Sequence, residues 1–153
     1  MADDVGFLRQ AVELARVNAA EGQLPFGAVI VRGEDVVATG VNTSLRDHDP
    51  TAHGEVVAVR AACRELESLS LAGTTLYTSC EPCPICHTVA IVAEVDRVVY
   101  AAPKEWVPDL RTPYAPILTE IQAAARELDS GRIEQLELPE AREPFAVYLE
   151  QLR

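Results

Sequence analysis

Residues 75–86 read TLYTSCEPCPIC, and this stretch joins a short strand to a helix. The strand is predicted for residues 75–78. Pro82 opens a helix over about 83–94, because proline is tolerated in a first helical turn, where its missing N–H has no partner to lose. A strand that runs directly into a helix is typical of an α/β fold.

Helices and strands alternate on both sides of this junction. Residues 33–35 predict a tight turn between two strands, residues 42–51 a polar loop, and residues 103–116 a proline-rich, irregular segment. This order predicts a single domain, residues 1–153, built as a three-layer α/β/α sandwich around a five-stranded, mixed, mostly parallel sheet. The expected helices cover about 4–20, 54–67, 83–94, 117–129 and 144–152, and the expected strands 27–31, 36–41, 75–78, 97–102 and 133–138.

The composition excludes several classes of protein. Hydrophobic residues make up 48% and charged residues 24% of the 153 residues, as in globular rather than disordered chains. The longest apolar runs, such as residues 27–31, are far too short to cross a bilayer, and the acidic N-terminus lacks the features of a secretion signal. We therefore expect a soluble, cytoplasmic protein with no membrane partner.

The charge balance disfavours nucleic acid as a partner. The 24 acidic and 13 basic residues give a net charge of -11, which repels a phosphate backbone. Lys104 is the only lysine, and the basic residues are scattered along the chain. A small ligand that is uncharged or weakly charged fits this balance better.

Three of the four cysteines, Cys80, Cys83 and Cys86, crowd into seven residues, and Cys63 stands apart. This crowding suits no disulfide framework, and a cytosolic chain keeps its thiols reduced. Clustered thiols in that compartment indicate metal or redox chemistry. Cys80 precedes the helix and Cys63 lies on an apolar helix face, so we expect both to be packed residues.

His53 begins the helix expected over 54–67 and offers a third ligand. Cys83 and Cys86 lie three residues apart in the first turn of their helix, so their sulfur atoms point the same way. The positive end of that helix favours thiolates. One imidazole and two thiolates form a three-ligand set for Zn²⁺, and a catalytic zinc site leaves its fourth position to water. Glu55 then stands where it reaches that water rather than the metal.

These residue types together equip the chain for hydrolytic deamination. Zn²⁺ lowers the pKa of a bound water from about 15.7 toward about 7, which makes hydroxide available at neutral pH. Glu55 takes a proton from that water and passes it to the leaving amine, so that ammonia departs from an amidine carbon. His-x-Glu followed by Pro-Cys-x-x-Cys is the signature of zinc deaminases.

On these motifs the chain resembles the cytidine deaminase-like superfamily, and within it the branch of guanine deaminases and tRNA adenosine deaminases. The resemblance covers roughly residues 5–102. The TSCEPCP form of the cysteine motif is especially similar to bacterial guanine deaminase. The stretches that carry the resemblance are PFGAVIV at 25–31, DPTAHGE at 49–55 and LYTSCEPCPIC at 76–86.

The resemblance implies a zinc-dependent aminohydrolase and a homodimer. The substrate it implies is a free nucleobase or a related amino-heterocycle. The residues it assigns are His53, Cys83 and Cys86 as zinc ligands, Glu55 as proton shuttle, and Phe26, Asn42 and the backbone of Ala52 as substrate contacts.

Alternatives stay open for three of the residues near the expected pocket. Asn42 hydrogen-bonds the base or is only a turn residue. Glu81 contacts the substrate or bonds backbone groups at its turn. Trp106 stacks on the bound base, or it anchors its own irregular segment or a dimer contact.

Three departures from the guanine deaminase pattern keep other substrates open. Gly54 stands where that branch usually has alanine, and Val92 where it tends to have an aromatic residue. Residues 106–114 lack the paired aspartates of that branch. Cytosine-like pyrimidines, triazines and modified purines are therefore alternatives to guanine.

Other functions use the same motif differently. A tRNA adenosine deaminase needs an RNA-binding surface, which the net charge of -11 and the acidic C-terminal helix oppose. A non-catalytic structural zinc module requires a fourth protein ligand, for which Cys80 is the candidate. A redox role of the thiols predicts activity that persists after chelation. The two other histidines, His48 and His87, are expected to face solvent.

Overall fold

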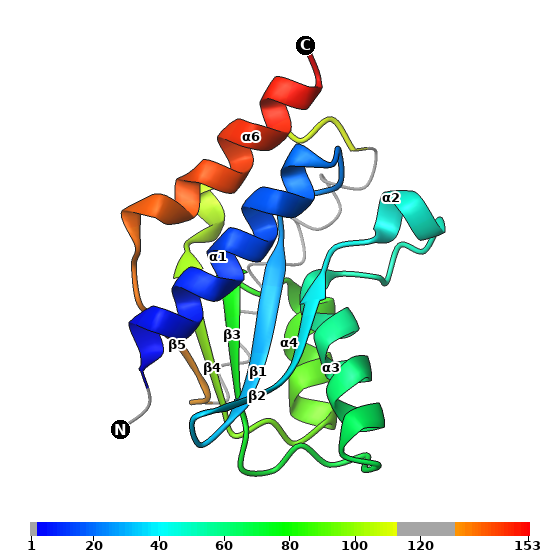
Figure 1. Cartoon of the computed structure of the whole chain (residues 1–153), viewed down its shortest axis with the longest axis vertical. Coiled ribbons are helices and arrows are strands. Elements are labelled where there is room, and N and C mark those ends of the chain that lie inside the picture. The colour runs from blue at the N-terminus through cyan, green and yellow to red at the C-terminus, as the bar shows by residue number, and fades with distance from the viewer. Residues whose placement is uncertain (1–2, 113–130) are drawn as a thin grey trace.

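The computed structural model describes residues 3–112 and 131–153, so the helix expected over 117–129 lies outside the described residues. The helices and strands follow the alternating order expected from the sequence (Figure 1). None of the described helices has the length and hydrophobicity needed to cross a membrane. The helices are α1 (Asp4–Ala20), α2 (Ser44–Asp47), α3 (Gly54–Glu65), α4 (Pro84–Val92) and α6 (Glu143–Gln151), with 3-10 turns at Lys104–Trp106 and Pro139–Arg142. The strands are β1 (Gly27–Arg32), β2 (Asp35–Val41), β3 (Thr75–Cys80), β4 (Arg97–Ala102) and β5 (Ile133–Gln135).

The described strands form one five-stranded sheet in the order β2-β1-β3-β4-β5. β1 pairs antiparallel with both β2 and β3, whereas β3 pairs parallel with β4 and β4 with β5. All strands except β1 therefore point the same way, which confirms the mixed, mostly parallel sheet. The reversal between β1 and β2 is a tight hairpin, in which Gly33 takes a positive φ of 65° that suits glycine.

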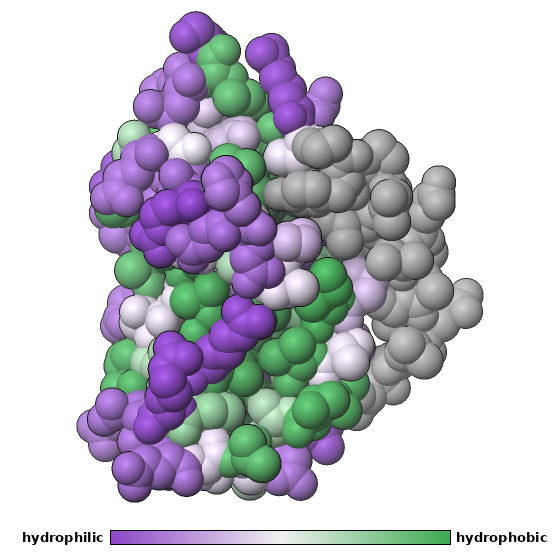
Figure 2. Space-filling view, turned by 90° about the vertical axis from the view of Figure 1, so that its right-hand side faces the viewer, coloured by the Kyte–Doolittle hydropathy of each residue, from purple (hydrophilic) through white to green (hydrophobic). Residues whose placement is uncertain are grey.

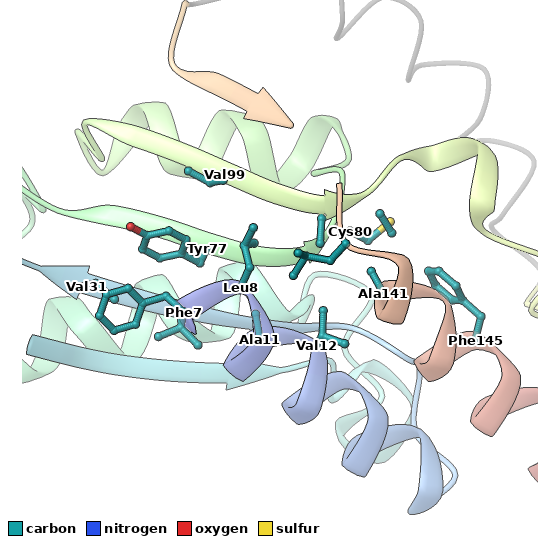
Figure 3. Packing of buried hydrophobic residues seen from close by; sticks show 14 residues of the cluster. Phe7, Leu8, Ala11, Val12, Val31, Tyr77, Cys80, Val99, Ala141 and Phe145 are labelled. Carbon is teal, nitrogen blue, oxygen red and sulfur yellow. The ribbon is translucent and has the colours of Figure 1, made fainter. Parts of the chain in front are cut away.

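Helices cover both faces of the sheet and make the three layers that the sequence predicts (Figure 1). α1 and α6 lie over one face, and α3 and α4 over the other. Side chains of β1 pack on both faces of the sheet. Val29 and Val31 belong to the cluster under α1 and α6. Ala28 and Ile30 belong to the cluster under α3 and α4. Figure 3 shows the first of these, the α1/α6 cluster, with Leu8 and Val12 of α1 packed against the sheet and Phe145 of α6 beside them.

Close packing of α3 on β2 fixes the place where α3 begins. A Cβ atom on Gly40 in β2 would lie 2.4 Å from both the nitrogen of Ala58 and the carbonyl oxygen of Gly54. Only glycine permits this approach of helix to strand. The first turn of α3, which carries part of the predicted metal motif, is therefore held directly against the sheet.

Two segments differ from the sequence prediction. Residues 44–47, expected in a polar loop, form α2, whose first N–H, that of Ser44, is bound by Oδ1 of Asn42. A helix of this length is too short to show apolar periodicity. The last strand ends at Gln135 rather than continuing to Leu138, because its pairing with β4 stops there.

Candidate metal centre and active site

The start of α3 carries the histidine and the glutamate of the motif. His53 occupies the N-cap position with extended backbone angles, and its carbonyl accepts the N–H of Val57. Glu55 lies in the first turn and is 5% exposed. Acidic side chains are almost never this buried unless partners satisfy them, so the surroundings of Glu55 decide its role.

The start of α4 carries the two cysteines. Cys83 occupies the N-cap position and Pro84, rather than the predicted Pro82, opens the helix, so α4 begins one residue later than expected. Cys86 follows within the first turn, and both thiols are buried. Because β3 leads directly into this turn, the sheet sets the position of both sulfur atoms.

The structure brings His53, Cys83 and Cys86 together into one triad. The Nδ1 atom of His53 lies 3.3 Å from Cys83 Sγ and 3.4 Å from Cys86 Sγ, and the two sulfur atoms are 3.5 Å apart. A tetrahedral zinc site with bonds of about 2.0–2.3 Å puts its ligand atoms about 3.3–3.8 Å apart. The donor set and its spacing therefore fit Zn²⁺. Residues 3–112 and 131–153 contain no other cluster of this kind.

Glu55 lies beside this triad. Its Oε2 atom is 3.2 Å from Cys86 Sγ, and its Oε1 atom accepts a hydrogen bond of 2.9 Å from the hydroxyl of Thr78 in β3. The carboxylate is thus held from two sides, by α4 and by the strand beneath. The arrangement places a proton-accepting group next to the three metal ligands.

The two thiols share one proton. The hydrogen bond from Cys86, helped by the neighbouring His53, lowers the pKa of Cys83 to about 4. The same contact raises the pKa of Cys86 well above its usual value, and burial acts in the same direction. One thiolate therefore exists at neutral pH before any metal binds, and a divalent cation between the sulfurs would ionise the second.

Burial and charge act on His53 and Glu55 as well. Burial opposes the protonation of His53, but the hydrogen bond and the charge of Cys83 outweigh it, so the pKa of His53 is raised. Burial raises the pKa of Glu55, and the negative charge of Cys83 adds to the effect. A carboxyl group with a raised pKa is suited to taking up and releasing a proton near neutral pH.

The other thiols and histidines lie outside the triad. Cys80 is buried in the α1/α6 cluster, where burial raises its pKa to about 12, and Cys63 packs against the α3/α4 cluster. Both are packed residues, as expected, and His48 is exposed. The prediction that His87 faces solvent is wrong, since only 7% of its surface is exposed. His87 shares with Ala90 the face of α4 that meets the sheet.

Three of the predicted substrate residues meet at the start of α3. The N–H of Asn42 donates to the carbonyl of Phe26 at 3.1 Å, and the carbonyl of Ala52 accepts the N–H of Thr43 at 3.0 Å. A Cβ atom on Gly54 would lie 3.3 Å from the carbonyl oxygen of Phe26. The start of β1, the end of β2 and the loop before α3 therefore form one continuous wall next to the triad.

Asn18, which sequence reasoning did not single out, holds this wall together. Its Nδ2 atom donates to the carbonyl oxygens of Leu24, at 2.8 Å, and of Asn42, at 2.9 Å, and the side chain is 5% exposed. One residue of α1 thereby ties the segment before Phe26 to the end of β2. A polar residue among the apolar positions of the first helix is the signal that could have identified it.

Glu81 and Trp106 lie beyond the ends of β3 and β4. The N–H of Glu81 donates to the carbonyl of Ala102 at 2.8 Å. The guanidinium of Arg142 lies 3.9 Å from the centre of the Trp106 ring, a cation–π contact. Trp106 also packs against the α1/α6 cluster. These contacts join the segment after β4 to the C-terminal elements and fix the position of Trp106.

The part of the chain that carries the triad and Glu55 is similar to a known protein family. The cytidine and deoxycytidylate deaminase zinc-binding region matches residues 1–102, two thirds of the chain. The chain belongs to this family. The triad and Glu55 all fall within the matched residues of this zinc-binding family, which confirms the resemblance and the cofactor predicted from the motifs.

Two curated deaminases illustrate the range of relatives. The guanine deaminase of Bacillus subtilis (strain 168) is 49% identical over 98 residues, which are 63% of this chain and 62% of that enzyme. The tRNA-specific adenosine deaminase of Buchnera aphidicola (subsp. Baizongia pistaciae, strain Bp) is 37% identical over 99 residues, 65% of this chain and 61% of that enzyme. The matched part of the chain thus spans less than two thirds of either relative.

The similarity in structure extends further along the chain. The X-ray structure of guanine deaminase from Bacillus subtilis superimposes with a TM-score of 0.67 and 34% identity, covering 95% of this chain and 93% of that chain. Identity falls from 49% over the matched 98 residues to 34% over almost the whole chain. Sequence similarity to this relative is therefore concentrated in part of the chain, whereas the structural superposition covers nearly all of it.

Proposed function

We propose that the chain is a zinc-dependent hydrolytic deaminase of a free nucleobase or related amino-heterocycle, with guanine as the first candidate. One observation carries the proposal: three ligand atoms lie within 4.8 Å of one another, and the carboxylate of Glu55 lies beside them. Three protein ligands leave one position of a tetrahedral zinc free, as in catalytic zinc sites. A structural zinc module needs a fourth protein ligand, and Cys80 is instead packed in the core.

In this proposal the chain supplies binding and proton transfer. His53, Cys83 and Cys86 hold Zn²⁺, which when bound supplies the Lewis acidity that makes water nucleophilic at neutral pH. Glu55 accepts a proton from the attacking water and delivers it to the exocyclic nitrogen, so that water and the amine become a carbonyl group and ammonia. The thiolate ligands also favour a cytoplasmic location, where thiols stay reduced.

Asn42, Phe26 and the backbone of Ala52 are the proposed binding wall for the base. Because Oδ1 of Asn42 is bound to the N–H of Ser44, its amide NH₂ is the end offered to a carbonyl oxygen or ring nitrogen of the substrate. The ring of Phe26 is fixed by edge-to-face contact with Phe145, at 6.0 Å between ring centres. A fixed aromatic ring of this kind is suited to contact a planar heterocycle.

We propose that Glu81 and Trp106 line the same site on the side of β4. The backbone contact of Glu81 with Ala102 fixes the position of Glu81 at the start of the metal-binding turn. The cation–π contact with Arg142 gives Trp106 a fixed orientation. We propose that both side chains line the pocket. The position of Trp106 also depends on Arg142, in the C-terminal third of the chain.

A free base is favoured over tRNA as the substrate. The net charge of -11 opposes binding to a phosphate backbone. Identity to the guanine deaminase, 49%, also exceeds identity to the tRNA-specific adenosine deaminase, 37%. Gly54 and Val92, which depart from the guanine deaminase pattern, keep cytosine and triazines among the substrates to be tested.

An ammonia-release assay tests the proposal. The Zn²⁺-loaded protein is incubated with guanine, cytosine, adenine, their nucleosides and triazine analogues, and in parallel with tRNA, in which inosine is measured. We expect release from a free base, fastest from guanine, with loss of activity on chelation and recovery on adding Zn²⁺. Absence of turnover of every base at one bound zinc per chain would overturn the proposal, and inosine in tRNA without base turnover would establish the tRNA deaminase instead.

We also propose that the chain forms a homodimer through the exposed side of α4. Ile91 and Val92 on this helix are 40% and 76% exposed. Figure 2, which views the side of the molecule where α3 and α4 lie, shows hydrophobic side chains reaching the surface there. Exposed apolar groups of this kind mark contact surfaces. Light scattering should give twice the chain mass of 16.6 kDa, and the mass of a single chain would contradict the proposal.

Replacing Asn18 with alanine should loosen the base-binding wall. Two buried carbonyl groups lose their donor, so we expect the free energy of unfolding to fall by about 1–3 kcal/mol. Because the segment before Phe26 is no longer tied to the end of β2 through Asn18, we expect KM to rise about 10-fold, equivalent to about 1.4 kcal/mol of binding. Denaturant unfolding and steady-state kinetics measure the two effects. Zinc content is the control and should not change; an unaltered KM would show that Asn18 does not position the wall.

A further inference from the structure

Thr78, a residue of β3 that is not one of the metal ligands, contacts the group proposed to carry the proton. Its side chain is 1% exposed. Its Oγ1 atom lies 2.9 Å from Oε1 of Glu55 and 3.2 Å from the carbonyl oxygen of Cys80. A threonine hydroxyl has one proton to donate, so it can serve only one of these two acceptors at a time.

The carboxylate is the stronger acceptor of the two. Hydrogen bonds to an ionised oxygen are shorter and roughly twice as strong as those to a neutral carbonyl. The distance to Glu55 is also the shorter one. Thr78 therefore donates to Oε1 whenever Glu55 is ionised, and β3 fixes that oxygen from below.

The two oxygen atoms of Glu55 consequently face different surroundings. Oε1 points to the strand and is occupied by the hydroxyl of Thr78, whereas Oε2 lies 3.2 Å from Cys86 Sγ, on the side of the triad. While Glu55 is ionised, the hydrogen bond from Thr78 holds Oε1 against the strand. Oε2 is then the oxygen turned toward the triad.

We propose that Thr78 is a positioning residue that holds Oε1 of Glu55, so that Oε2 stays turned toward the triad for proton transfer and the carboxylate is kept from becoming a fourth metal ligand. This inference rests on the proposed deaminase function. It assigns Thr78 no contact with the substrate; the residue acts through Glu55. A valine at this position has nearly the shape of threonine but no hydroxyl, so it leaves Oε1 buried without a donor.

Kinetics of Thr78→Val and Thr78→Ser provide the first test. We expect Thr78→Val to lower kcat by about 10- to 100-fold with KM within about twofold, the pattern of a lost interaction that acts on the chemical step. Thr78→Ser keeps the hydroxyl and should stay within about threefold of the unaltered enzyme. The matched control is Thr74→Val, because Thr74 is equally buried and donates to the carbonyl of Leu71, outside the site. Its kcat should not change.

The visible spectrum of the Co²⁺-substituted protein provides a second test that needs no substrate. We expect Thr78→Val to change the position and intensity of the d–d bands, because the released carboxylate turns toward the metal. Thr78→Ser and Thr74→Val should give the spectrum of the unaltered protein. An unchanged spectrum together with a kcat within about twofold in Thr78→Val would overturn the proposal.

The two tests separate this inference from the proposed function. If the unaltered Zn²⁺-loaded protein turns over no base, the proposed function fails, and the Co²⁺ spectra still decide whether Thr78 holds Glu55. If a base is turned over and Thr78→Val behaves like the unaltered enzyme in both tests, the proposed function stands and the role of Thr78 is refuted.

Discussion

The Glu55→Gln variant is expected to bind one Zn²⁺ per chain and to lose deaminase turnover by about 10²- to 10⁴-fold, the range typical of a lost general acid–base group. Glutamine has the shape of glutamate and can still accept the hydrogen bond from Thr78, so the fold and the triad stay in place. It cannot take a proton from the attacking water. Ammonia release and metal analysis of the same sample measure the two properties together.

A control for this variant lies on the same helix. Glu65 ends α3 and is exposed, so Glu65→Gln removes an equal charge far along the helix and should keep full activity. Turnover by Glu55→Gln at the rate of the unaltered enzyme would exclude Glu55 as the proton shuttle. Loss of zinc from Glu55→Gln would instead make Glu55 a metal ligand.

Replacing either triad cysteine by serine is expected to remove both zinc and activity. Zinc affinity in Cys83→Ser and Cys86→Ser should fall by more than the roughly 10- to 100-fold that is typical when only an outer hydrogen-bond partner of a zinc ligand is changed. Because metal binding contributes to folding free energy, thermal stability of the zinc-loaded protein should fall as well. Metal analysis after dialysis and thermal unfolding measure these effects.

The other two cysteines provide the controls. Cys63 lies on α3 and packs against the α3/α4 cluster, and Cys80 packs in the α1/α6 cluster, so Cys63→Ser and Cys80→Ser should each keep one zinc per chain. Loss of zinc from Cys80→Ser would support a closed structural site with four protein ligands. Full zinc binding by Cys83→Ser would contradict the triad itself.

Elements with strong local signals could be predicted from the sequence, and short ones could not. α1 and β4 begin and end at the residues expected, because helical spacing of apolar residues marks α1 and Gly22 follows its end. α2, with residues 44–47, depends on the hydrogen bond between Asn42 and Ser44 and has no periodicity of its own.

The metal ligands could be predicted from the sequence, whereas the residues that position the site around them could not. His53, Cys83 and Cys86 follow a fixed pattern of residue types and spacing, which the chemistry of zinc requires. Thr78 and Asn18 act on partners 23 and 24 positions away in the chain, and no local pattern marks such pairs. The burial of His87 likewise depends on which face of α4 meets the sheet, which the neighbouring zinc ligand does not reveal.

X-ray absorption at the zinc edge of the purified, zinc-loaded protein tests the central claim most directly. The account predicts one zinc with two sulfur and two nitrogen or oxygen neighbours, at about 2.3 Å and about 2.0–2.1 Å. A third sulfur neighbour would indicate a closed structural site, and failure of the protein to bind zinc would remove the basis for hydrolytic deamination; either result would contradict the account.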